Sequence, residues 1–152
     1  MKVEVYRLEV YRLDDRAKLP ERSTRGSVGY DIFSVEDVKI KPGEFKLIRT
    51  GLVVKSEFPF GIFLFPRSSL FRSKGLIMTN SVGVIDFDYC GEGDEVMIPV
   101  INVSNKVAQI KAGEKIAQMV FLYIGDPEVV EVSEPPGDLS RGGFGSTGGY
   151  QS

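Results

Sequence analysis

Two aspartates lie one residue apart, directly before a tyrosine, in the stretch NSVGVIDFDYCGE (Asn80–Glu92). Side chains alternate between the faces of a β-strand, so on a strand Asp86 and Asp88 would point the same way and Phe87 the opposite way. If the chain turns sharply here, Tyr89 can join that face and cover whatever Asp86 touches. The pattern is equally typical of a solvated hairpin turn, where aspartate is common because it bonds its own backbone.

The absence of histidine restricts the chemistry that such a stretch could perform. With no histidine and one cysteine, a zinc site made only of protein ligands is disfavoured, and Ser-His and Cys-His nucleophilic catalysis are excluded. An enzyme of this composition working near neutral pH needs an Asp or Glu as its base, or else a lysine of depressed pKa. A metal, if one is used, should be a hard, oxygen-preferring ion such as magnesium.

Two further stretches carry polar groups that could bind a ligand. Pro66-Arg67-Ser68-Ser69 places a cation and two hydroxyls at a possible helix start, where free backbone N–H groups favour an anion. A serine in that position is also an ordinary helix N-cap. Gln118 lies within the apolar run Ile116–Met119, where it could bond buried backbone groups as easily as a ligand.

The chain has 152 residues, about one domain, and a net charge of −2 with both signs mixed. Bulk electrostatics therefore predict neither a nucleic-acid partner nor a membrane partner. The single cysteine, Cys90, excludes an internal disulfide and is typical of a reducing compartment. The first residues alternate charged with apolar side chains, unlike a signal peptide, so we expect a cytoplasmic protein, with nuclear or viral origin left open.

Short apolar runs separated by Gly and Pro predict an all-β fold, a jelly-roll-like barrel or sandwich with at most one short helix. The helix is expected in SSLFRSKG after Arg67, ended by Gly75. Paired turns are expected at KPGE (Lys41–Glu44) and KAGE (Lys111–Glu114). Strands are expected at Val3–Leu8, Gly29–Ser34, Val38–Ile40, Lys46–Val54, Gly61–Phe65, Ile77–Asn80, Val96–Asn102, Val107–Ile110 and Ile116–Ile124.

The composition changes after Ile124, and we expect a β-barrel domain over residues 1–134 and a C-terminal arm over residues 135–152. The Gly-rich arm buries too little to offset an ordering cost of roughly 1–2 kcal/mol per residue, so it should be mobile unless a ligand or partner holds it. A frayed terminus is the alternative.

Five stretches resemble, in sequence and in order, the five motifs of the trimeric dUTPases, the deoxyuridine 5'-triphosphate nucleotidohydrolases. The resemblance implies a homotrimeric jelly roll that splits dUTP into dUMP and pyrophosphate with Mg²⁺, which keeps uracil out of DNA and supplies dUMP for thymidylate synthesis. It also implies that the arm of one subunit closes an active site built by two others. The stretches are GSVGYDI (Gly26–Ile32), PRSSL (Pro66–Leu70), NSVGVIDFDYCGE (Asn80–Glu92), KAGEKIAQMVF (Lys111–Phe121) and RGGFGSTG (Arg141–Gly148).

The resemblance assigns the reaction to a few of these residues. Asp86 would be the general base that activates the water attacking the α-phosphorus, and it would also hold the sugar 3′-hydroxyl. Arg67 and Mg²⁺ would neutralise phosphate charge. Mg²⁺ would be held mainly by the substrate phosphates, with Asp31 in contact through water.

The remaining matches concern substrate recognition. Asn80 and the backbone around Val84 would bind the uracil edge in a tight hairpin with no room for a 5-methyl group. Tyr89 would pack on the deoxyribose where a 2′-hydroxyl would clash. Ser68, Ser69 and Gln118 match other substrate-binding positions. In the arm, Phe144 would stack on uracil, while Arg141, Gly145, Ser146 and Thr147 would bind the phosphates.

The match departs from the family pattern near Tyr89 and in the arm. Leu139 stands where an arginine is usual, and Arg141 lies only three residues before Phe144, which changes how it could reach a phosphate. Cys90 replaces a common basic residue. Gly93–Glu95 looks like an insertion, expected to lengthen a hairpin without touching the site.

Two other functions fit part of the pattern. A dCTP deaminase shares the fold and a PRSSL-like segment, but its catalytic glutamate would fall near Pro99, and Glu95 aligns there only if the register shifts. A non-catalytic jelly-roll module that binds nucleotides is the second alternative, opposed by the intact set of matched residues.

Overall fold

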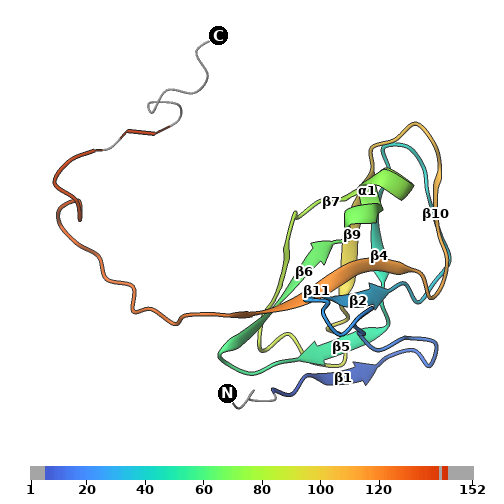
Figure 1. Cartoon of the computed structure of the whole chain (residues 1–152), viewed down its shortest axis with the longest axis horizontal. Coiled ribbons are helices and arrows are strands. Elements are labelled where there is room, and N and C mark those ends of the chain that lie inside the picture. Colours follow the sequence, from blue (N-terminus) through green and yellow to red (C-terminus); the bar gives the residue numbers. More distant parts are fainter. Residues whose placement is uncertain (1–5, 141, 144–152) are drawn as a thin grey trace, which may run out of the picture.

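The computed structural model describes residues 6–140 and 142–143, and its body is an all-β, jelly-roll-like fold with one short helix (Figure 1). Every strand pairing in this part of the chain is antiparallel. The strands are β1 Glu9–Arg12, β2 Tyr30–Phe33, β3 Val38–Ile40, β4 Phe45–Arg49, β5 Leu52–Lys55, β6 Phe60–Pro66, β7 Leu76–Met78, β8 Gly83–Ile85, β9 Met97–Asn102, β10 Ala108–Ile110 and β11 Lys115–Tyr123.

The strands form a four-stranded sheet, β2-β11-β6-β8, a three-stranded sheet, β4-β9-β7, and two pairs, β1-β5 and β10-β3. Alternate residues point inward, as in β9, where Ile98, Val100 and Asn102 are buried while the residues between them are partly exposed. The inward side chains form one apolar core that includes Ile32, Ile48 and other fully buried aliphatic residues. Packing of this core holds the strands in place, and with them the polar residues at the strand ends that are described below.

The two predicted KxGE turns are confirmed and have the same hydrogen bonds. Glu44 N–H donates to the Lys41 carbonyl at 3.0 Å, and Glu114 N–H donates to the Lys111 carbonyl at 2.9 Å. In both turns the glutamate carboxylate also accepts the lysine backbone N–H. The glycine of each turn has a positive φ, 75° at Gly43 and 82° at Gly113, which explains why glycine is required.

The predicted helix is confirmed as α1, Ser68–Lys74. Gly75 ends it in the left-handed conformation, with φ 66°, and its N–H donates to the Phe71 carbonyl. The N-cap is Arg67, and no side-chain hydrogen bond caps the helix. Neither serine of the PRSS stretch therefore serves as the N-cap.

Four local expectations differ from the structure. The run Lys46–Val54, expected as one strand, forms parts of two strands, β4 and β5, with Thr50 and Gly51 between them. The first strand begins at Glu9, and residues 6–8 of the predicted strand Val3–Leu8 lie outside it. Asp86 and Asp88 lie beyond β8 in a turn, so strand alternation does not apply to them. The turn after Met78 leads from β7, which pairs with β9, to β8, which pairs with β6, so it crosses between sheets and is not a hairpin.

After β11 the chain runs away from the barrel (Figure 1), and residues 125–140 are all exposed. The apolar run Val129–Val132 forms no strand. Within residues 6–140 and 142–143, no helix has the length and apolar character needed to cross a membrane.

Candidate active site

Four of the predicted site residues line one hollow of about 320 Å³: Asp31, Arg67, Ser68 and Gln118. They come from three of the predicted motifs, which are far apart in sequence. The loop before β2 forms the rest of the wall, with Ser23, Ser27, Val28 and Gly29. The fold thus brings together a carboxylate, a guanidinium, an amide and several hydroxyls.

The register of the four-stranded sheet explains this convergence. On β11, Gln118 lies opposite Asp31 of β2 on one side and Phe65 of β6 on the other. Directly opposite residues of neighbouring strands have side chains on the same face, so Gln118 and Asp31 share a face. Arg67 follows β6 immediately, at the end of the strand that lies beside Ala117.

Asp31 is the electrostatic centre of the hollow. Its Oδ1 lies 3.0 Å from Nε of Arg67, and its Oδ2 lies 2.8 Å from Nζ of Lys115. The hydroxyl of Ser23 donates to Oδ2 and also accepts a 2.7 Å bond from Lys115. Burial raises the pKa of Asp31, but the hydrogen bonds from Lys115 and Ser23 and the charge of Arg67 together leave this pKa below its ordinary value. Asp31 is therefore ionised near neutral pH.

Lys115 and Ser23 were not predicted as site residues. Lys115 and Gln118 are separated by an odd number of positions, so a regular strand would place them on opposite faces. A register shift between Lys115 and Ala117 breaks this alternation and lets Lys115 reach Asp31 as well. Nothing in the sequence signals this irregularity, and the Ser23 contact depends on the path of a loop.

Gln118 is partly exposed, and its Nε2 donates to the Pro66 carbonyl at 3.1 Å. This bond holds the amide beside the residue that precedes Arg67. The other side of the amide lies against Gly29, where an added Cβ would overlap the Gln118 Oε1 atom. Gly29 therefore leaves the space in which Gln118 reaches the hollow.

A second group of predicted residues lies elsewhere, around β8. Asn80 is exposed in the turn after β7, and Val84 is an exposed residue of β8. β8 is at the edge of its sheet, so one side of its backbone is not paired within the described chain. Asp86 follows β8, is exposed, and accepts a 3.1 Å hydrogen bond from Tyr89 N–H through its carbonyl. The expected sharp turn before Tyr89 is thus present.

Asp86 and Arg67 lie at opposite ends of β6. Ile85 pairs with Ile62, so Asp86 is one position beyond that pair, level with Gly61. Arg67 lies six positions further along the same strand direction. At about 3.3 Å per residue, the two are separated by roughly 20 Å within one chain.

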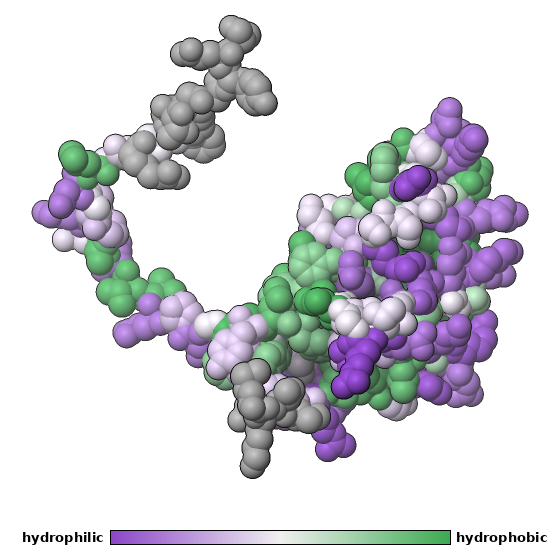
Figure 2. All heavy atoms as spheres, viewed as in Figure 1, coloured by the Kyte–Doolittle hydropathy of each residue, from purple (hydrophilic) through white to green (hydrophobic). Residues whose placement is uncertain are grey.

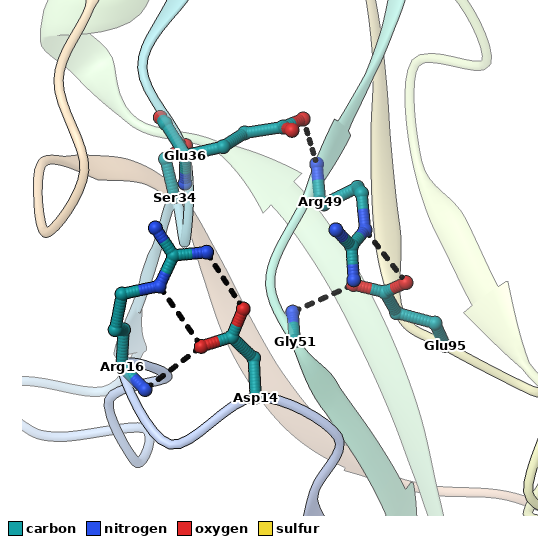
Figure 3. A network of polar contacts seen from close by, with 7 residues as sticks. All are labelled: Asp14, Arg16, Ser34, Glu36, Arg49, Gly51 and Glu95. Atoms are coloured by element: carbon teal, nitrogen blue, oxygen red, sulfur yellow. Dashed lines mark hydrogen bonds and ion pairs between the residues drawn. The ribbon is translucent and has the colours of Figure 1, made fainter.

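The Gly93–Glu95 insertion contacts Tyr89, contrary to the expectation that it leaves this region alone. The Tyr89 hydroxyl donates to the Glu95 carbonyl at 3.1 Å. The Glu95 side chain is buried, with its carboxylate against Arg49 and Gly51 (Figure 3). Sequence spacing could not reveal the contact between the Glu95 carboxylate and Gly51, because these residues are 44 positions apart.

The remaining predicted residues belong to neither group. Ser69 lines a neighbouring hollow of about 280 Å³ beside α1, and Arg67 lines this second hollow as well. Pro99 lies on β9 opposite Leu47. Arg141, Phe144, Gly145, Ser146 and Thr147 lie outside the described residues.

The chain matches known proteins over most of its length. A family model described as dUTPase matches residues 15–148, which include the hollow around Asp31 and the whole of β8 and its turn. The chain belongs to the dUTPase family. As a member of this family, it is an enzyme of nucleotide metabolism, a dUTP diphosphatase that hydrolyses dUTP. The deaminase and the non-catalytic module are thereby set aside.

Individual members of the dUTPase family align with nearly the whole chain. A deoxyuridine 5'-triphosphate nucleotidohydrolase from Nautilia profundicola is 41% identical over 143 residues, which cover 93% of this chain and 99% of that protein. A variant of the Staphylococcus bacteriophage 80alpha dUTPase, solved with dUpNHpp, superposes with a TM-score of 0.81 at 29% identity and covers 93% of this chain and 98% of its own.

A third similar structure concerns a metal. A variant dUTPase from phage phi11 of S. aureus, described as revealing the coordination of a structural Mg(II) ion, has a TM-score of 0.75 at 28% identity. It covers 86% of this chain and 99% of its own. Within residues 6–140 and 142–143 of the present chain, no cluster of three or more Asp, Glu, Cys or His side chains could hold a metal ion.

Proposed function

We propose that this enzyme hydrolyses dUTP to dUMP and pyrophosphate by attack of an Asp86-activated water on the α-phosphorus. The observation that carries the proposal is the convergence of Arg67, Ser68 and Gln118 around Asp31 in one hollow, with Lys115 paired to the same carboxylate. Two cations, Arg67 and Lys115, pair with the single carboxylate of Asp31, so this cluster carries an excess of positive charge, which suits a polyphosphate. Gln118 and Ser68 add neutral hydrogen-bonding groups for phosphate oxygens.

In the proposed step, Asp86 accepts a proton from water as the water oxygen bonds to the α-phosphorus. The bond from that phosphorus to the oxygen bridging to the β-phosphate breaks, and pyrophosphate leaves with that oxygen. The chain contributes mainly position and charge, since Arg67 holds the phosphates while Asp86 orients the water. Asp86 is exposed, as it must be to receive a water and a sugar hydroxyl.

The substrate base would bind at the free edge of β8. Uracil presents a row of carbonyl and N–H groups, and an unpaired strand edge presents the complementary backbone groups. Asn80 lies in the turn that leads into this edge, and the exposed Val84 lies on it. Tyr89, one turn beyond Asp86, would cover the deoxyribose and exclude a 2′-hydroxyl.

Because Asp86 and Arg67 are separated by about 20 Å in one chain, we infer that each active site combines β8 of one copy with the hollow of another. Three copies would form a homotrimer, with the arm of residues 135–152 closing a site of its neighbours and bringing Arg141, Phe144, Gly145, Ser146 and Thr147 to it. The barrel of residues 1–134 would form the rest.

An exposed apolar face on the three-stranded sheet supports assembly of copies. Phe45 lies opposite Ile101 and Leu47 lies opposite Pro99, while Ile77 lies opposite Ile101 on the other side. Phe45, Leu47 and Ile77 are 52%, 48% and 41% exposed. Figure 2 shows apolar residues gathered on the flank that carries β7, whereas the opposite flank is mainly hydrophilic. A face of this kind is stabilised when a second copy covers it.

Magnesium fits this site as an ion carried by the substrate. Both oxygens of Asp31 are already engaged by Arg67 and Lys115, so its contact with the ion would run through water. When bound, Mg²⁺ would neutralise phosphate charge and help the pyrophosphate to leave.

By hydrolysing dUTP, the enzyme would keep uracil out of DNA and supply dUMP for thymidylate synthesis. A cytoplasmic location stays a prediction, supported by the free thiol of Cys90.

An isotope experiment tests the proposed step. The enzyme is incubated with dUTP and Mg²⁺ in ¹⁸O-labelled water, and the products are analysed by mass spectrometry. Attack at the α-phosphorus places the label in dUMP and leaves pyrophosphate unlabelled. Label in pyrophosphate, or release of inorganic phosphate, would contradict the mechanism. UTP, dTTP and dCTP in parallel reactions, with ammonia measured for dCTP, test the specificity.

A further inference from the structure

The carboxylate of Glu95 is buried at the junction between β4 and β5. Its Oε1 accepts the Gly51 N–H at 2.7 Å, and its Oε2 accepts Nε of Arg49 at 3.1 Å (Figure 3). The residue is only 8% exposed. A buried carboxylate costs little free energy only where hydrogen-bond partners satisfy it. The contacts of Glu95 with Gly51 and Arg49 therefore hold the loop in this one conformation.

The backbone around Glu95 is fixed to the same junction. Val96 N–H donates to the Leu52 carbonyl at 2.8 Å, and the Thr50 hydroxyl donates to the Val96 carbonyl at 2.6 Å. Gly51 itself is held in a left-handed conformation, with φ 69°, and an added Cβ would lie 2.9 Å from Cβ of Ala17. The Glu95 peptide is therefore attached to a rigid part of the barrel.

Tyr89 is held at two points by this arrangement. Its N–H donates to the Asp86 carbonyl at 3.1 Å, and its hydroxyl donates to the Glu95 carbonyl at 3.1 Å. The first bond sets the Tyr89 backbone relative to Asp86, and the second fixes the far end of the ring relative to the barrel. Tyr89 as a whole residue is still 38% exposed, so it can contact a ligand while its hydroxyl is bound.

We propose that Glu95 is a positioning residue for sugar selection, which holds the Tyr89 ring in place by anchoring the carbonyl that binds its hydroxyl. The inference rests on the proposed role of Tyr89 at the deoxyribose. Steric exclusion of a 2′-hydroxyl requires a ring that cannot move aside, and the Glu95 anchor supplies that rigidity. The inserted segment Gly93–Glu95 is thus part of the specificity apparatus of this chain.

The test compares kcat/KM for dUTP with kcat/KM for UTP in the full-length enzyme. Glu95→Ala removes both side-chain contacts, and Tyr89→Phe removes the hydroxyl that the carbonyl binds. Each should lower the dUTP-to-UTP ratio by roughly three- to tenfold, the range set by one hydrogen bond. The double variant should lower the ratio no further than the larger single effect, because both changes break one linkage.

Matched variants keep this result interpretable. Glu95→Gln keeps an oxygen for the Gly51 N–H, so its ratio should fall less than that of Glu95→Ala. Glu92→Gln changes an exposed carboxylate of the same loop and should leave the ratio unchanged. If Glu95→Ala does not fold, Glu95→Gln tests the side chain instead, and an unchanged ratio in both Glu95→Gln and Tyr89→Phe would overturn the proposal. Equal loss of activity with both nucleotides would indicate a purely structural role and overturn the proposal.

Tyr89→Ala separates this inference from the proposed function on which it rests. If Tyr89→Ala leaves the ratio unchanged, the ring does not select the sugar, and the assigned role of Tyr89 is wrong. If Tyr89→Ala lowers the ratio while Tyr89→Phe and Glu95→Ala do not, the ring selects the sugar without the anchor. That outcome overturns the inference alone.

Discussion

Nε of Arg67 lies 3.0 Å from Oδ1 of Asp31, at the point where β6 has ended and the chain turns into α1. The carboxylate holds this guanidinium at the hollow before any phosphate arrives. Lys115 binds the other oxygen of Asp31 at 2.8 Å, so both cations are positioned by a single anion. An arriving polyphosphate would meet donors that are already oriented, which reduces the entropy lost on binding.

The carboxylate of Asp31 should stabilise the fold at neutral pH and lose this effect in acid. The folded-state pKa of Asp31 is depressed, so its contribution is fully present above the ordinary pKa of about 4 and is lost as pH falls through the folded-state value. Asp31→Asn should lower the free energy of unfolding by about 1–2 kcal/mol at pH 7, because both ion pairs are partly exposed. Urea titrations at pH 7 and at the lowest pH that preserves the fold measure this difference. An equal loss at both pH values would contradict it.

Gly29→Ala should impair substrate binding without unfolding the protein. A Cβ at this position overlaps the Gln118 amide oxygen, so the amide must leave its place in the hollow. We expect kcat/KM for dUTP to fall about tenfold, the effect of losing one well-placed polar contact. Gly26→Ala is the matched control, since its Cβ would lie 4.0 Å from Oγ1 of Thr24, an ordinary contact distance. Equal effects of the two substitutions would contradict the steric explanation.

Asp86→Asn should retain nucleotide affinity and lose most turnover. The amide can still accept a hydrogen bond from water or the sugar, but it cannot take a proton, and kcat should fall by about 10²–10⁴. Asp88→Asn changes another exposed aspartate, two residues away, and should have little effect. Single-turnover kinetics and equilibrium binding of a non-hydrolysable dUTP analogue measure the two properties. Normal turnover in Asp86→Asn would remove this residue as the base.

Mixing two inactive variants should restore activity if Asp86 and Arg67 of different copies form one site. Asp86→Asn and Arg67→Ala subunits are each defective, but a mixed assembly contains sites with both residues intact. Random mixing at equal amounts predicts about a quarter of the wild-type activity after dissociation and reassembly. Activity that never rises above the sum of the separate variants would show that each site is built by a single chain.

Truncation before Arg141 should leave the barrel folded and assembled but reduce catalysis. Residues 125–140 are exposed and contribute nothing to the core, so removing the chain from Arg141 onward should not change the thermal unfolding temperature. Circular dichroism and sedimentation velocity test folding and assembly, and steady-state kinetics test activity. A truncated enzyme with full kcat/KM would show that the arm has no part in the reaction.

Local sequence rules predicted the local structure well. Gly75 ends α1 and the two KxGE turns form as expected, because each depends on residues within one turn of the chain. The sequence also identified Asp31, Arg67, Ser68 and Gln118 by resemblance, and the register of β2, β11 and β6 brings them together.

Contacts between distant segments could not be predicted in the same way. Glu95 reaches Gly51 through the packing of two loops, and Lys115 reaches Asp31 only because β11 has a register shift. The distance between Asp86 and Arg67 follows from the pairing of β8 with β6, which no local pattern specifies. Each of these features depends on the tertiary arrangement of several strands.

In the assembly proposed above, burial of the exposed side chains of Phe45, Leu47 and Ile77 between copies would make the rate of this enzyme depend on its concentration. On strong dilution the copies would separate, and every site would lose the half supplied by its neighbour at the same moment. The rate per molecule should then fall with dilution, and a cell that makes little of the protein would have less dUTP hydrolysis than its molecule count suggests.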